Sequence, residues 1–127
     1  MRGKLITKCP LDPEPWPRDS RATVLSGSVL PGTYVYVRDA SGLIYVCPDP
    51  LAGHGSHLHP KVLGYGQPVS GAGAITIGEN ATIERLDNYS VTFRFGPDIL
   101  KSILDQALKQ GMAKSENTRI ISWTKHF

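Results

Sequence analysis

The sequence predicts an α+β fold, a mostly antiparallel β-sheet closed by one amphipathic helix near its C-terminal end. Three observations support this. Two adjacent runs rich in β-branched and aromatic residues are joined by a short polar turn. Three more strand-like runs follow as a meander, with closure into a barrel as an alternative to an open sheet. A helical apolar stripe then precedes a last run suited to an edge strand.

Size and composition fit one small globular domain. The chain has 127 residues, of which 40% are hydrophobic and 20% charged, as is ordinary for a folded domain. The net charge of +3 comes from basic residues spread along the chain. Nucleic acid is therefore not favoured as a partner, and the basic and aromatic tail from Arg119 to Lys125 with Trp123 is first interpreted as structural.

No targeting or membrane segment is visible. No run approaches the ~20 apolar residues of a membrane span, and no apolar signal core follows Met1-Arg2-Gly3-Lys4. We expect a chain that is cytoplasmic as synthesised. Delivery to a target cell without a cleaved signal peptide is compatible with this.

Residues 1–21 are predicted to form an extended arm, and residues 22–127 one β-rich domain. Four prolines fix the backbone of the arm: Pro10, Pro13, Pro15 and Pro17. Trp16 would anchor the arm on its own domain. This packing is favoured over a proline-rich ligand for a partner module because no PxxP repeat is sustained.

The first hairpin is predicted from Thr33–Arg38 and Leu43–Cys47, joined by the turn Asp39-Ala40-Ser41-Gly42. Tyr34 and Tyr36 share one face and Val35 and Val37 the other, so both faces should be at least partly covered. An upstream strand near Ala22–Val29 could pair with the hairpin.

A long loop is predicted from Pro48 to Gly73. Its prolines and glycines leave little room for a regular element: Pro48, Pro50, Gly53, Gly55, Pro60, Gly64, Gly66, Pro68, Gly71 and Gly73. Long loops inside compact domains are often functional.

The meander comprises Ala74–Gly78, Ala81–Leu86 and Tyr89–Phe95. In the last of these, alternation directs Tyr89, Val91, Phe93 and Phe95 to the core, and Ser90, Thr92 and Arg94 to solvent or to a site.

The helix is predicted near residues 97–110. Gly96-Pro97-Asp98 suits its start and Gly111 its end. The apolar stripe should pack on the sheet: Ile99, Leu100, Ile103, Leu104, Ala107 and Leu108. Arg119–Thr124 is predicted as the final edge strand.

Cys9 and Cys47 do not form a paired metal-ligand spacing. Free buried thiols are the favoured interpretation, and a disulfide between them is the alternative in an oxidising compartment.

His54, His57 and His59 form the one histidine cluster. They are weak candidates for a metal site, because a closed site also needs a carboxylate or thiolate nearby. His59, beside the rigid Pro60, is alternatively the best placed general acid or base.

Other motifs are weaker. The glycines of Gly64-Tyr65-Gly66 and Gly71-Ala72-Gly73 could bring backbone amides to an anion, but turn formation is favoured because the spacing matches no phosphate loop. Ser90, His59 and Glu84 could be combined into a triad, yet no G-x-S-x-G elbow is present. Ser90, Thr92 and Arg94 suit an anionic or polar ligand, although solvated surface is favoured.

Four segments in order carry a family resemblance. They are YVYVRDASGLIYVCPD, HPKVLGYGQPVSGAGAITI, LDNYSVTFRF and a helix ending in glycine. From Tyr34 to Gly111 the chain resembles a C-terminal module of bacterial polymorphic toxin and Rhs-type proteins, and more distantly part of the plant calmodulin-binding proteins with an IQ motif, a motif this chain lacks.

The resemblance implies a bacterial effector context, interbacterial competition. Its matching positions are His59, Leu63, Gly64, Gln67, Val69, Ala72, Gly73, Ser90 and Phe93. Many relatives have an acid where this chain has Ala74, and a glycine where it has Val91. If that acid is catalytic in relatives, this chain would be inactive.

The sequence therefore favours a binding or recognition module in a toxin or effector system, with a protein partner or a small polar or anionic ligand. Its expected ligand-binding residues are His59, Gly64, Gln67, Ser90, Thr92 and Arg94. The alternative is a toxin-type enzyme, a nucleotide-cofactor transferase or a nuclease, that uses His59 and Arg94, with Ser90 as a further catalytic candidate. An immunity-type partner is disfavoured by the positive charge. No specific cofactor follows from these motifs.

Overall fold

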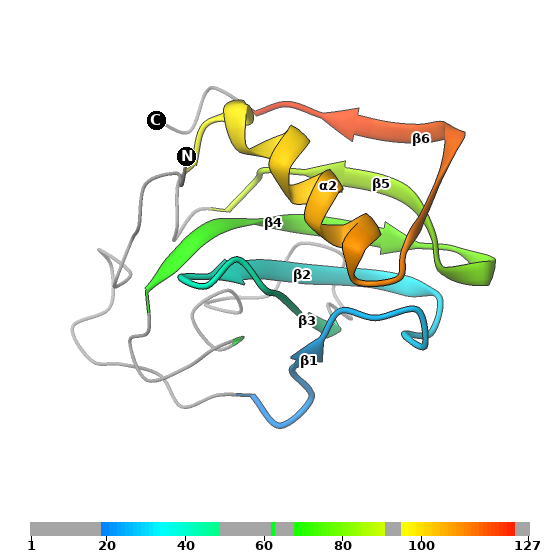
Figure 1. The fold of residues 1–127 in the computed structure, drawn as a ribbon, viewed down its shortest axis with the longest axis horizontal. Coiled ribbons are helices and arrows are strands. Elements are labelled where there is room, and N and C mark those ends of the chain that lie inside the picture. The colour runs from blue at the N-terminus through cyan, green and yellow to red at the C-terminus, as the bar shows by residue number, and fades with distance from the viewer. Residues whose placement is uncertain (1–18, 49–61, 63–67, 91–94, 124–127) are drawn as a thin grey trace.

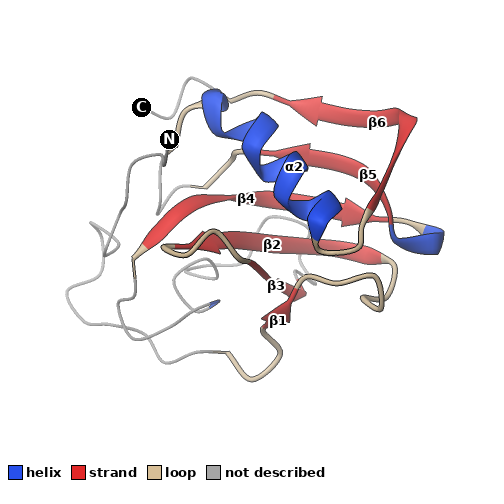
Figure 2. Ribbon diagram, viewed as in Figure 1, coloured by secondary structure: helices blue, strands red, loops and turns tan. Residues whose placement is uncertain are grey.

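The computed structural model describes residues 19–48, 62, 68–90 and 95–123. All six described strands belong to one mixed, mostly antiparallel sheet in the order β1-β3-β2-β4-β5-β6 (Figure 1). Helix α2 crosses one face of this sheet (Figure 2). The sheet is open, with β1 and β6 at its edges, so the predicted α+β class is confirmed without closure into a barrel.

The first hairpin is confirmed. β2 (Gly32–Asp39) pairs antiparallel with β3 (Ile44–Pro48). The turn is stabilised by Asp39, whose Oδ1 accepts hydrogen bonds from the backbone N–H of Ser41 and of Leu43 at 2.9 and 3.0 Å. The predicted upstream strand is only the two residues of β1 (Thr23–Val24), which pair with β3.

The predicted long loop is wrong at its C-terminal end, because β4 (Val69–Ile77) already begins at Val69. Gly71 and Gly73 are strand residues rather than turn residues. A Cβ on Gly71 would lie 2.9 Å from Ile103 Cδ1, and one on Gly73 would overlap the Asp87 carbonyl. These glycines therefore make room for the helix and for β5, a requirement that composition alone does not reveal.

The predicted meander is only partly confirmed. A 3₁₀ turn (Glu79–Ala81) leads from β4 to β5 (Thr82–Asp87), and these strands pair antiparallel as expected. The predicted strand Tyr89–Phe95 does not continue the sheet at its described ends, since Tyr89, Ser90 and Phe95 belong to no strand. Residues 91–94 lie outside the described part of the chain.

The neighbour of β5 is instead β6 (Ala113–Ile121), which runs parallel to it. A parallel pair needs a crossover connection, and the predicted helix supplies it. A 3₁₀ turn (Pro97–Ile99) leads into α2 (Leu100–Lys109), and Gly111 follows with a φ of +99°. β6 is the predicted edge strand, but it begins at Ala113, six residues before the predicted start at Arg119.

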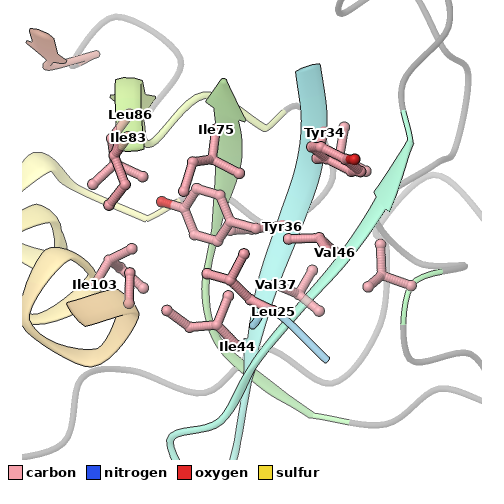
Figure 3. Packing of buried hydrophobic residues seen from close by; sticks show 14 of the residues in the cluster. Leu25, Tyr34, Tyr36, Val37, Ile44, Val46, Ile75, Ile83, Leu86 and Ile103 are labelled. Atoms are coloured by element: carbon pink, nitrogen blue, oxygen red, sulfur yellow. The ribbon is translucent and has the colours of Figure 1, made fainter. Parts of the chain in front are cut away.

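The core lies on both sides of β2. Tyr36 is fully buried between the sheet and α2, beside Ile75 and Ile103 (Figure 3). On the opposite face Val35 and Val37 are also buried, which confirms that both faces are covered. The predicted helical stripe packs on the sheet through Leu100, Ile103 and Ala107, whereas Leu108 is exposed.

Candidate functional site: the Arg38 pocket

Most of the predicted site residues lie outside the described part of the chain: His54, His57, His59, Gly64, Gln67, Thr92 and Arg94. Ser90 is described, and only 1% of it is exposed, so it does not point outward as predicted. The alternation failed there because the chain has left the sheet after Asp87. Glu84 is exposed and lines a hollow to which Ser90 does not contribute.

The metal and disulfide predictions remain untested. Within the described ranges no group of three or more His, Cys, Asp or Glu side chains could hold a metal ion, and the three histidines lie outside those ranges. Cys47 is fully buried in β3, and Cys9 lies outside the described residues.

The structure instead reveals a buried arginine at the end of β2. Arg38 has the same parity along the strand as Tyr34 and Tyr36, so its side chain lies on the face covered by α2. It is opposite Gly71 of β4 in the sheet register. Because Gly71 has no side chain, α2 approaches closely and Ser102 comes within reach of the guanidinium. Only 9% of Arg38 is exposed.

Three hydrogen bonds hold the Arg38 guanidinium, and all of their acceptors are neutral. Nε donates to Ser70 Oγ at 2.9 Å, Nη2 to the Ser70 carbonyl at 2.8 Å, and Nη1 to Ser102 Oγ at 2.8 Å. The two hydroxyls are oriented in turn, because Ser70 Oγ donates to the Asp39 carbonyl and Ser102 Oγ to the Ile99 carbonyl. A guanidinium has five N–H donors, so Nη1 and Nη2 each retain one that no residue of the described ranges accepts.

The positive charge of Arg38 has no ion-pair partner among the residues that the structure describes. Burial lowers the pKa of the guanidinium, but an arginine stays protonated in proteins. A buried charge that is hydrogen-bonded only to neutral groups is costly for the fold. An anion in contact with Arg38 would reduce this cost.

The guanidinium forms part of the wall of a pocket of about 300 Å³. The hairpin turn forms one side, and one helix face forms the other, with Ser102, Asp105, Gln106 and Lys109. Lys109 adds a second positive charge. The one carboxylate among the lining residues, Asp105, is paired with Lys101 at 3.2 Å. The pocket thus offers two cations and several neutral hydrogen-bonding groups.

The sequence contained one sign of this site. Arg38 lies on the same face of its predicted strand as Tyr34 and Tyr36, and both faces of that strand were expected to be covered. The sequence therefore placed a charged residue at a position expected to be buried, which is unusual for arginine. Its partners Ser70 and Ser102 come from β4 and α2, and nothing in their local sequence links them to Arg38.

Comparisons of the chain with family models, curated proteins and solved structures found no match. The relationship to polymorphic toxin and Rhs-type proteins therefore stays a prediction from the sequence. No helix in the described ranges is long and apolar enough to cross a membrane.

Proposed function

We propose that this protein is a binding module that recognises a small anionic group, a carboxylate or a phosphate, in the Arg38 pocket. One observation supports this most directly. Arg38 is buried, and among the described residues it has neutral partners only, which leave one N–H on each terminal nitrogen. Arginine recognises carboxylates and phosphates through such paired donors.

Binding is favoured over catalysis by the chemistry of the lining. The titratable side chains of the pocket are Arg38, Asp105 and Lys109. Arg38 and Lys109 are cationic, and the Asp105 carboxylate is held by Lys101. Ser70 and Ser102 use their hydroxyl protons on backbone carbonyls, so neither is paired with a general base.

The test compares the wild type with Arg38→Met in thermal unfolding at increasing concentrations of phosphate and of acetate. A ligand that binds only the folded state raises its stability with concentration. We expect the melting temperature of the wild type to rise with at least one anion, and that of Arg38→Met to rise much less. Arg21→Met is the matched control, because Arg21 is exposed and paired with Asp19.

Two further variants keep the proposal testable if Arg38→Met does not fold. Lys109→Met and Ser102→Ala change exposed residues of the same pocket. Each should weaken anion binding in isothermal titration calorimetry without preventing folding. Equal anion responses in the wild type and all pocket variants would refute the proposal.

The setting we propose for this binding is a bacterial toxin or effector system, on the strength of the sequence resemblance. The enzymatic alternative depends on His59 and Arg94, outside the described residues. Inducible expression in bacteria separates the two. We expect normal growth with soluble wild-type protein, whereas growth arrest that His59→Ala abolishes would favour the enzyme.

A further inference from the structure

A second polar surface lies at one edge of the sheet, where β5 and β6 run side by side (Figure 1). We call it the β5–β6 ribbon: β5 and β6 with Tyr89 and Trp123, which follow them. The parallel register sets Arg85 directly opposite Arg119. Beyond the strand ends, the rings of Tyr89 and Trp123 are in contact, with centroids 4.8 Å apart. The fold thus assembles a basic pair and an aromatic pair from residues distant in sequence.

A bulge in β6 hollows the surface around the two arginines. Ile83 pairs with Lys114 and Arg85 pairs with Arg119, so β6 uses five residue steps where β5 uses two. Thr118 Oγ1 fixes the extra residues, because it accepts from the Ser115 N–H at 3.0 Å and donates to the Ile83 carbonyl. Bulges often redirect side chains beside binding sites.

The resulting hollow has a volume of about 420 Å³ and a polar lining: Thr76, Thr82, Glu84, Arg85, Ser115, Asn117 and Arg119. The hydroxyls, the amide and the guanidinium groups can all donate hydrogen bonds to an anion. Glu84 is the one acid of the lining, and its carboxylate packs against Gly78.

The two arginines of the hollow differ in their ion pairing. Arg85 is paired with Asp87 at 3.2 Å, and only 3% of the Asp87 side chain is exposed. Arg119 is exposed and forms no ion pair with any residue in the described ranges. A phosphate in the hollow would give Arg119 an anionic partner, and Arg85 opposite it would supply further guanidinium N–H donors.

Hydrogen bonds hold the backbone of Trp123 at the end of the ribbon. Asn88 is fully buried, and its side chain accepts from the Trp123 N–H at 2.7 Å and donates to the Trp123 carbonyl at 2.9 Å. Trp123 is nevertheless 37% exposed. An exposed indole on a fixed backbone can stack against a flat ring without a large loss of conformational entropy.

We propose that the β5–β6 ribbon binds single-stranded nucleic acid, with a phosphate between Arg85 and Arg119 and a base stacked on Trp123. Basic side chains that follow the backbone, together with aromatic stacking platforms, are the chemistry of single-strand binding. The amino-acid composition did not favour this partner, because the arginines and the aromatics come together only in the fold. The proposal is independent of the Arg38 pocket.

The test measures the fluorescence anisotropy of labelled oligothymidylate and oligouridylate of about ten nucleotides, a length within the usual range of single-strand sites. Arg119→Gln and Trp123→Leu should each weaken binding by about fivefold or more. Lys101→Gln is the charge-matched control, because Lys101 lies on the exposed side of α2 and its side chain is 87% exposed. This control should bind like the wild type.

Salt dependence gives a second measurement. One phosphate neutralised on a single strand predicts a slope of about −0.7 in log affinity against log salt, which Arg119→Gln should bring close to zero. Absence of binding by the wild type at low salt would overturn the proposal. Equal weakening by Arg119→Gln and Lys101→Gln would also overturn it, since attraction would then depend on net charge rather than on the ribbon.

Discussion

Arg38 and Arg85 lie in strands of the same sheet, yet their charges are compensated in different ways. Arg85 is partly exposed and has the buried carboxylate of Asp87 at 3.2 Å. Arg38 is buried, and its three acceptors are two hydroxyls and a carbonyl. Removing Asp87, the partner of Arg85, should therefore destabilise the fold more than removing Arg38.

The difference indicates whether each arginine contributes to the stability of the fold or to binding. At Arg85 the negative partner belongs to the fold, so the pair contributes mainly to stability. At Arg38 the described residues supply only neutral dipoles, and an anionic ligand would compensate the charge. A ligand anion would therefore be a second anionic partner for Arg85, but the first for Arg38 among the described residues.

The largest expected effect is that of Asp87→Ala. Asp87 Oδ1 accepts from the Ala74 and Tyr89 N–H groups at 2.8 and 2.9 Å, and Oδ2 pairs with Arg85. The substitution leaves these donors without their acceptor in a buried place, and we expect the free energy of unfolding to fall by about 3 kcal/mol or more. Urea unfolding followed by circular dichroism measures it. A loss below about 1 kcal/mol would contradict a structural role for the carboxylate.

Arg38→Met should destabilise the protein less, by about 1 to 2 kcal/mol in the same urea experiment without added anions. The variant loses hydrogen bonds to Ser70 and Ser102 but also removes a desolvated charge. A loss equal to that of Asp87→Ala would show that Arg38 is a structural residue of the same kind as Asp87.

Tyr36→Phe tests the hydrogen bond that links β2 to β5 across β4. Tyr36 on β2 donates its hydroxyl proton to the Asp87 carbonyl at 2.7 Å. Loss of this hydrogen bond should lower the free energy of unfolding by about 1 kcal/mol at neutral pH. Burial, and secondly the Asp87 charge, raise the pKa of Tyr36 well above its usual value.

A raised pKa in the folded state keeps Tyr36 protonated, so its contribution is intact below the unfolded pKa of about 10 and is lost as the pH rises above it. The stability of the wild type should therefore fall more steeply above about pH 10 than that of Tyr36→Phe. Parallel pH profiles of urea unfolding for the two proteins would argue against a buried, protonated hydroxyl.

The smallest effect is expected for Lys101→Ala. Lys101 and Asp105 form an ion pair between side chains that are 87% and 54% exposed. Exposed pairs on a helix contribute little, and the change in stability should stay below about 0.5 kcal/mol. A change above about 1 kcal/mol would show that exposed charges matter here as much as buried ones.

The sequence predicted the elements that local pattern determines. The β2–β3 hairpin, with its Asp39 turn, and the helix between Pro97 and Gly111 have strong local signals, and both are confirmed. The extent of β4 was missed because Gly71 and Gly73 are required by contacts with Ile103 and Asp87, and tertiary contacts of this kind leave no periodic signal.

The site was harder to predict than the fold. Periodicity could mark Arg38 as a charge on a core-facing position, but the serines that hold it come from β4 and α2. The pairing of Arg85 with Arg119 was hidden because β6 is parallel to β5 and a helix intervenes. Spacing along the chain cannot predict which side chains a crossover brings together.

The edge position of β6 also has a kinetic consequence. β6 joins the sheet through β5 alone, and its pairing is the one parallel ladder among the described strands. Proteins open locally, and peripheral elements exchange their amide protons faster than central strands. If β6 detached, Arg119 would move away from Arg85, while the hydrogen bonds between β2 and β4 near Arg38 would stay intact. Amide protection in β6 should accordingly report a local opening, and protection in β2 the unfolding of the whole sheet.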